Sequence, residues 1–210
     1  MTGVQTCALP IFRFQDAVAA WLAVRVWAGI DAPVTIIPEG NDDVERRGPR
    51  GTGLVQVKSR REHMGPTPIA TVRDYLKELW TRHDKVTPDP STLELLLERP
   101  ITDHPVETDT TIIPNARLKS LLPGGARGDA LLKKTTIQHV PEPHEAAIAT
   151  IAERAECSPL AAQICFAQLL VEIGNLSNQN GRLKPPDYRG LSASDTDHVI
   201  TAALEAIDID

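Results

Sequence analysis

The segment VTIIPEGNDDVERRGPRGTGLVQVKSR, residues 34–60, decides the predicted fold of this chain. It begins with an apolar run at residues 34–38, passes through an acidic turn, and ends in a stretch where residues 54–58 read LVQVK. Successive side chains of a strand point to opposite faces, so this period-2 pattern predicts a strand with Val55 and Val57 toward the core. Gln56 and Lys58 then share the other face. The segment therefore predicts a sheet that brings an amide and a lysine close to an acidic turn.

The acidic turn contains the carboxylates that a hard cation needs. Mg²⁺ prefers oxygen ligands, keeps several waters, and is usually held by one or two carboxylates. Asp43 directly precedes the apolar Val44, so its side chain should point away from the core, and Asp42 is the reserve. Glu39 is either a metal ligand or a helix or loop partner. A lysine beside a metal can orient or deprotonate a water, which points to Lys58. The opposing interpretation is plain turn chemistry, because Asp and Asn favour turns.

Three motifs in the same order resemble the PD-(D/E)xK nuclease superfamily, in the branch where Gln replaces the second acid. They are Phe14-Gln15, then residues 39–44 reading EGNDDV, then residues 55–58 reading VQVK. The resemblance is greater to the dsDNA-nuclease domain at the N-terminus of bacterial anti-phage effectors, including CD-NTase-associated nucleases and STAND NTPases. It covers residues 14–60, and the rest of the chain fits only by general pattern.

The resemblance implies a fold, a cofactor and a set of site residues. The implied fold is an α/β restriction-endonuclease-like core of order α-β-β-β-α-β, with a mixed sheet flanked by helices and a C-terminal helical region. The implied cofactor is Mg²⁺ or Mn²⁺. The implied catalytic residues are Asp43, Gln56, Lys58, Glu39 and Gln15. The implied metal ligands are Asp43, Glu39, Asp42 and the backbone carbonyl of Val57.

The implied activity is hydrolysis of phosphodiester bonds in duplex DNA with little sequence specificity, as an Mg²⁺-dependent endodeoxyribonuclease of anti-phage defence. One alternative is a catalytically inactive, nuclease-like module for DNA binding or assembly. Another is a site-specific restriction endonuclease of the Mrr type. Double-stranded DNA is the expected partner, with self-association through an attached sensor or ATPase domain. The residues expected to contact DNA are Arg46, Arg47, Arg60 and Arg61, although charge runs are also common on solvated edges.

Composition narrows these expectations. The 210 residues carry a formal net charge of −6, so any affinity for nucleic acid must come from a local basic surface. Cys157 and Cys165 match neither a zinc pair nor a CxxC motif, which predicts reduced core thiols in a cytoplasmic protein. The six histidines have no ligand spacing. No run of residues reads as a membrane span, and a cytoplasmic location is expected.

The element pattern divides the chain into three parts. Residues 1–11, MTGVQTCALPI, resemble a translated sequencing adapter and are set aside as non-native. Residues 12–140 form the predicted core. Residues 141–210 form a predicted helical extension that leads to a further domain. The expected elements are a helix at 14–28, strands at 34–38, 43–47 and 54–59, a helix around Val72 to Arg82, strands at 93–98, 110–113 and 134–140, a helical turn at 116–122, helices at 145–156 and 159–173, a loop at 176–186, and a helix that Ser194 caps and that runs to about 207.

Overall fold

The computed structural model describes residues 14–87, 89–102 and 125–207. The elements in chain order are α1 (Phe14–Trp27), β1 (Thr35–Pro38), β2 (Val44–Gly48), β3 (Gly51–Lys58), a 3-10 turn η1 (Glu62–Met64), α2 (Ile69–His83), β4 (Thr92–Leu97), α4 (Ala126–Lys134), β5 (Thr135–His139), α5 (Pro143–Arg154), α6 (Pro159–Asn180) and α7 (Ala193–Ile207). The strands and helices alternate irregularly, as in a mixed α/β protein.

A single five-stranded sheet of order β1-β2-β3-β4-β5 organises the described residues. β1, β2 and β3 form an antiparallel meander, in which Val44 lies opposite Val55. β4 pairs with β3 in parallel, and β5 pairs with β4 in parallel, so Gln56 lies opposite Leu95. β3 is therefore a central strand, paired on both edges.

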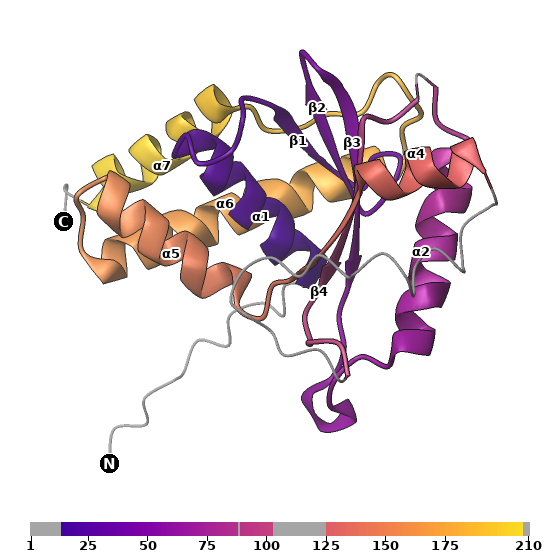
Figure 1. Cartoon of the computed structure of the whole chain (residues 1–210). Helices are drawn as coiled ribbons and strands as arrows, with labels where there is room; N and C mark the ends of the chain where they lie inside the picture. The colour runs from indigo at the N-terminus through magenta and orange to yellow at the C-terminus, as the bar shows by residue number, and fades with distance from the viewer. Residues whose placement is uncertain (1–13, 88, 103–124, 208–210) are drawn as a thin grey trace.

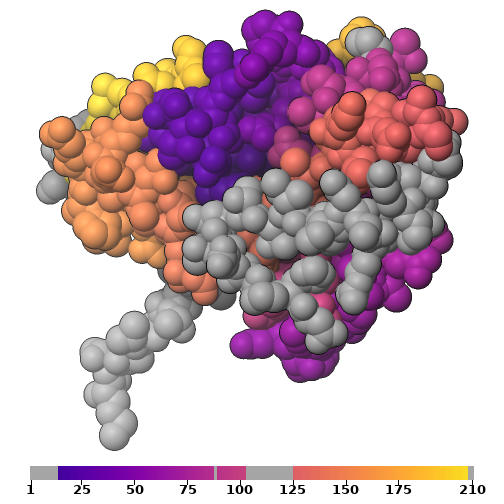
Figure 2. Space-filling model, in the orientation of Figure 1, coloured from indigo at the N-terminus to yellow at the C-terminus, as the bar shows by residue number. Residues whose placement is uncertain are grey.

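Helices cover the two faces of this sheet unequally (Figure 1). α1 lies against β1 and β3, and α5, α6 and α7 pack around α1. α2 lies on the opposite side of the sheet, against β3 and β4, with α4 near it (Figure 1). We call these the α1 face and the α2 face. In the space-filling view, α1, α5 and α7 make up much of one side of the molecule (Figure 2).

The core of the α1 face is built around α1 itself. Eight of its fourteen residues are buried, on every side of the helix. A helix that is apolar all round is expected to be fully enclosed. The same core includes Val55 and Val57 of β3, Phe166 of α6 and Ile200 of α7. Residues on both sides of the predicted boundary at residue 140 thus contribute to one hydrophobic core; the boundary itself stays a prediction.

The predicted order of the first six elements is confirmed, and with it the mixed α/β class. Val55 and Val57 join the core of the α1 face, whereas Leu54 joins a second core beneath α2 with Leu76 and Leu95. The prediction that Gln56 and Lys58 share the other face agrees with this arrangement. That face is not open, however, because α2 covers it and leaves Gln56 fully buried.

The C-terminal half departs from the sequence-based expectations in three places. α4 was not predicted. α6 continues through Asn180, into the segment expected to be a loop. Asn180 is buried, and its amide nitrogen donates to the carbonyls of Pro38 and Arg189, so tertiary contacts hold the polar end of the helix. Ser192, rather than Ser194, caps α7, because its hydroxyl accepts from the Asp195 N–H while Asp195 accepts from the Ser192 N–H. The expected strand at 110–113 and helical turn at 116–122 lie outside the described residues.

α6 also requires a correction about membrane spans. By length and composition it is apolar enough to cross a bilayer, the one such helix among the described residues. The core helix of a globular domain passes the same test, and α6 buries Cys165, Phe166 and Ile173 in the core of the α1 face. Burial raises the pKa of the Cys165 thiol to about 11. Cys157 and Cys165 are both free, as expected.

Candidate cation site beneath helix α2

The acidic turn lies between β1 and β2, at the end of β3 that carries Lys58. Glu39 has a left-handed backbone, with φ of 51°, and its N–H donates to the Asp43 carbonyl at 2.9 Å. Asp43 Oδ2 accepts from the Val57 N–H at 2.8 Å. β2 begins only at Val44. The Asp43 carboxylate, just before it, therefore accepts from the Val57 N–H of β3 in place of a backbone carbonyl of β2. Asp43 is thereby fixed beside the strand that carries Gln56 and Lys58.

Asp42 is the more deeply buried carboxylate of the pair, with 3% of its surface exposed. Its Oδ1 accepts from Arg82 Nη1 of α2 at 2.5 Å and from the Asp43 N–H at 2.9 Å. Its Oδ2 is buried and has no hydrogen-bond partner among the described residues. Burial raises the pKa of Asp42 to about 7, although the charge of Arg82 opposes that rise.

Gln56 is fully buried in the middle of β3. Neither its Oε1 nor its Nε2 has a hydrogen-bond partner within the described part of the chain. An unsatisfied buried polar group costs about 1–3 kcal/mol, and native proteins tolerate few of them. Such a cost is expected where a side chain serves a site rather than the stability of the fold.

Lys58 closes the same face at the end of β3. Its Nζ donates to Glu78 Oε2 at 3.0 Å and lies 5.1 Å from the centre of the Tyr75 ring. Glu78 also pairs with Arg82 at 3.1 Å. Although partial burial opposes it, the hydrogen bond from Lys58 holds the pKa of Glu78 below its usual value. Helix α2 therefore presents Tyr75, Glu78 and Arg82 to the charged groups below it.

The structure brings together most of the residues expected to form the site. The charges of Asp43 and Lys58 both act on Asp42, and the backbone N–H of Val57 donates to Asp43. Glu39 joins them through its backbone. Gln15 lies in the first turn of α1 on the other face, and no hydrogen bond of the described residues connects it to this group.

The arginines expected to contact DNA are mostly engaged inside the protein. Arg46 pairs with Asp31 and Glu94, and Arg47 pairs with the buried Glu45. Arg60 donates to the carbonyls of Gly65 and Met64, and so supports the turn η1. Arg61 is exposed. Three of these four arginines therefore bind other groups of the same chain, which leaves little basic surface at this site.

The sequence pattern alone does not reveal the contribution of α2. Tyr75, Glu78 and Arg82 follow one another at helical spacing, which places them on one side of the helix. Their residue types alone resemble a solvated surface stripe. Only the packing of α2 over β3 identifies them as partners of Lys58 and Asp42.

The residues fit a lightly coordinated divalent cation and not a closed metal cage. Across residues 14–87, 89–102 and 125–207, no group of three or more His, Cys, Asp or Glu could hold a metal ion. Mg²⁺ needs fewer protein ligands, because it keeps several waters and commonly uses one or two carboxylates. Asp42, through its unpartnered Oδ2, and Asp43 supply the one or two carboxylates of that smaller requirement, and the unpartnered Gln56 amide belongs to β3, the strand to which Asp43 is bonded.

The fold of this chain is similar to that of a group of solved receptor structures. The Cap4 SAVED/CARF-domain containing receptor of Acinetobacter baumannii, in complex with the cyclic trinucleotide 2'3'3'-cAAA, matches with a TM-score of 0.57 and 13% identity, over 98% of this chain and 46% of that chain. The Cap4 receptor of Moraxella osloensis matches with a TM-score of 0.54 and 16% identity, over 93% of this chain and 47% of that chain. The chain thus spans about half the length of these receptors. No protein-family model and no curated protein matches the sequence.

These likenesses contradict the predicted DNA endonuclease. The matching structures named here are described as SAVED/CARF-domain containing receptors, some of them with a bound cyclic trinucleotide. The non-specific and the Mrr-type endonuclease are therefore both withdrawn, and double-stranded DNA as the partner is not supported. The motifs at residues 39–44 and 55–58 located a real cluster of side chains, but not the function assigned to it.

Proposed function

We propose that this chain is one domain of a Cap4-like receptor of anti-phage defence, in a protein that responds to a cyclic oligonucleotide. The observation that carries the proposal is the fold match, which extends over 93–98% of the chain at TM-scores of 0.54–0.57. The anti-phage context agrees with the family resemblance of residues 14–60. The finer label of a restriction-endonuclease-like core stays a prediction.

The cyclic oligonucleotide is bound mainly by the part of the receptor that this chain does not match. A cyclic trinucleotide carries three phosphate charges, whereas this chain has a net charge of −6. Four cations of the sheet and α2, namely Arg46, Arg47, Lys58 and Arg82, are in ion pairs. Binding three phosphates here would require these pairs to break, and each exposed carboxylate would remain as a repulsive neighbour.

Calorimetric titration tests this assignment. The complete receptor that contains this domain and the 210-residue chain alone are each titrated with 3'3'3'-cAAA and 2'3'3'-cAAA. We expect the receptor to bind at least one of them, and the isolated chain to bind at least about 100-fold more weakly, a difference of about 2.7 kcal/mol. If the receptor binds neither compound, the receptor proposal fails. If the isolated chain binds as tightly as the receptor, the assignment of the ligand to the other part fails.

We also propose that the site beneath α2 binds Mg²⁺ or Mn²⁺. Asp43, Asp42 and Gln56 would hold the cation, with Glu39 and the Val57 carbonyl as further oxygen donors. The cation would supply positive charge to a phosphate group or a water. The buried, unpartnered Asp42 Oδ2 supports this proposal. The prediction that the domain is a metal-dependent hydrolase stays a prediction.

The cation is tested by Mn²⁺ titration of the chain and of Asp43→Asn, with Asp84→Asn as the matched control. Asp84 is an aspartate at the end of α2 that pairs with Arg127, outside the site. We expect Asp43→Asn to weaken Mn²⁺ binding at least about tenfold, since it removes a charged ligand, and Asp84→Asn to leave it unchanged. Equal binding by all three proteins would refute the site.

A further inference from the structure

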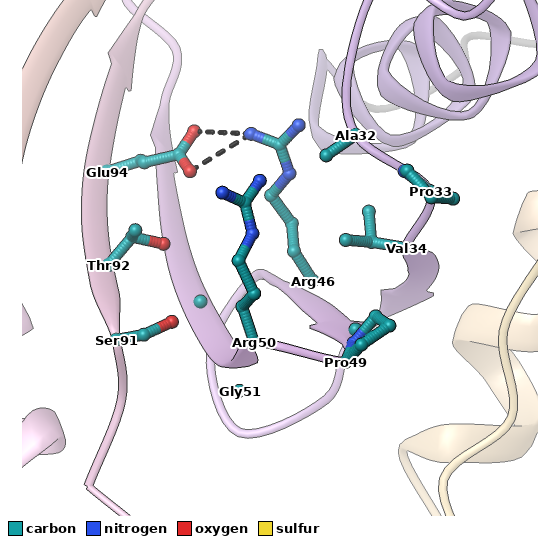
Figure 3. Close-up of a pocket in the computed structure, with 12 residues that line it drawn as sticks. Ala32, Pro33, Val34, Arg46, Pro49, Arg50, Gly51, Ser91, Thr92 and Glu94 are labelled. Atoms are coloured by element: carbon teal, nitrogen blue, oxygen red, sulfur yellow. Dashed lines mark hydrogen bonds and ion pairs between the residues drawn. The ribbon is translucent and has the colours of Figure 1, made fainter.

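A second pocket lies at the opposite end of β3, on the α1 face. Its volume is about 490 Å³. Residues 32–34, which lead into β1, form one wall, residues 48–51 of the β2–β3 hairpin form another, and Ser91, Thr92 and Glu94 line the side of β4 (Figure 3). The volume lies within the range of about 300–1,000 Å³ found for small-molecule sites. It has room for about one nucleotide.

Glycines keep this pocket open. A Cβ at Gly53 would lie 2.4 Å from Thr92 Oγ1, and a Cβ at Gly48 would lie 2.6 Å from Val34 Cγ1. Any larger residue at these positions would displace the walls or fill the floor. The strand pair therefore exposes its backbone here, and the pocket is a feature of the local sequence GPRGTG at residues 48–53.

A rigid charge network forms the inner wall. Arg46 Nη1 donates to both carboxylate oxygens of Glu94 at 3.0 Å, and Arg46 Nη2 donates to Asp31 at 2.7 Å. Arg25 donates to the same Asp31 at 2.9 Å. Although burial opposes it, the hydrogen bonds from Arg25 and the charge of Arg46 hold the pKa of Asp31 below its usual value. The positive charges of Arg25 and Arg46 thus balance the negative charges of Asp31 and Glu94. Arg46 and Glu94, the two that line the pocket, are held in place by these bonds.

Arg50 adds one uncompensated positive charge. Its side chain extends beside that of Arg46, facing the side of the pocket formed by Thr92 and Glu94 (Figure 3). No ion pair or hydrogen bond engages its guanidinium among the described residues. Since the network beside it is neutral, the lining carries a net charge of about +1.

We propose that this pocket binds a phosphate monoester attached to a flat heterocycle, that is, a mononucleotide. Arg50 binds the phosphate, since guanidinium groups suit phosphate oxygens, and the Thr92 hydroxyl is placed to donate to it. Pro33 and Pro49 present apolar surface to the ring (Figure 3). The Glu94 carboxylate, held in place by Arg46, accepts from an exocyclic amine such as that of adenine. The inference is independent of the proposed receptor function.

The probe is AMP, compared with adenosine and with inorganic phosphate, in titrations of the whole chain followed by calorimetry and by amide NMR shifts. We expect AMP to bind at least about fivefold more tightly than either fragment, because only AMP engages both walls. The amide signals of Gly51 and Gly53 should shift with saturation. Arg50→Gln should weaken AMP at least about tenfold, to the level of adenosine. The matched control Arg61→Gln, which alters an exposed arginine outside the pocket, should bind AMP within about twofold of the unaltered chain.

Several outcomes would overturn the proposal. One is no AMP binding up to about 10 mM, a level weaker than ordinary small-ligand sites. Another is equal weakening by Arg50→Gln and Arg61→Gln, which would mean a diffuse charge effect. A 5'-phosphorylated dinucleotide distinguishes a free nucleotide from the phosphorylated end of a nucleic-acid strand. Tighter binding of AMP supports a free nucleotide, and tighter binding of the dinucleotide supports the end of a nucleic-acid strand; either result supports the phosphate-monoester site.

Discussion

The α1 face and the α2 face of the sheet are built from the same strands but differ in whether their buried polar groups have hydrogen-bond partners. On the α1 face, four helices enclose a core that is almost entirely apolar, and the buried polar residues Asn180 and Thr196 have hydrogen-bond partners. On the α2 face the core is smaller, and Asp42 and Gln56 are buried with polar atoms unpartnered. The difference indicates that the α1 face supplies stability and that the α2 face gives some of it up for a site.

The largest expected effect lies in the α1 face. Leu169→Ala removes a fully buried side chain of α6 and should lower the free energy of unfolding by about 3–5 kcal/mol, the cost of lost burial plus a cavity. The control is Val171→Ala on the same helix, where 49% of the residue's surface is exposed and the loss should stay below about 1 kcal/mol. Urea denaturation measures both. Similar losses for the two variants would mean that α6 is not a core helix.

The next effect is the pH dependence of Asp42. Its pKa is raised from 3.8 to about 7 in the folded chain, so the folded state binds the proton more tightly than the unfolded state. Stability from this group is complete below pH 3.8 and is lost as the pH rises toward 7. Asp42→Asn should therefore gain stability relative to the unaltered chain across that window, up to a limit of about 4 kcal/mol.

Thermal unfolding between pH 4 and 8 checks this expectation. Asp84→Asn is the control, because the hydrogen bond from Arg127 holds the pKa of Asp84 below 3.8, so the difference between this variant and the unaltered chain should stay constant from pH 4 to 8. If the difference in stability between Asp42→Asn and the unaltered chain does not vary with pH, the pKa of Asp42 is not raised by burial.

A smaller gain is expected at Gln56. Gln56→Met replaces an unsatisfied buried amide with an apolar side chain of similar length and should raise the free energy of unfolding by about 1–2 kcal/mol. Gln138→Met on β5, where the side chain is only partly buried, should change it by less than about 0.5 kcal/mol. A marked loss of stability in Gln56→Met would show that the amide has partners and that the α2 face carries no such cost.

The smallest effect concerns the ion pair between Lys58 and Glu78. Glu78→Gln should cost less than about 1 kcal/mol, because 43% of the Glu78 side chain is exposed and solvent screens the pair. Asp74→Asn is the matched control on the same helix, since Asp74 approaches Lys77 only at 4.0 Å. A loss above about 2 kcal/mol in Glu78→Gln would mean that α2 is held on the sheet mainly by charge.

The sequence was most informative where one local pattern matched one tertiary role. The alternation at residues 54–58 predicted β3 and the opposite orientation of Val55 and Gln56, and the acidic turn predicted the contact with that strand. It was least informative where distant residues decide the outcome. The helical end of α6 depends on Asn180 reaching Pro38, and the burial of Gln56 depends on α2. The same motifs also led to a wrong function, because a pattern of side chains does not specify what a fold is used for.

The central proposal for the α2 face is a divalent cation held at Asp42 and Asp43. Paramagnetic broadening of amide NMR signals by Mn²⁺ tests it most directly, because the broadening maps where the cation lies. We predict that substoichiometric Mn²⁺ broadens the amides of Asp42, Asp43 and Val57 first, leaves those of α6 sharp, and loses this pattern in Asp43→Asn. Broadening centred elsewhere, or unchanged in Asp43→Asn, would contradict the claim.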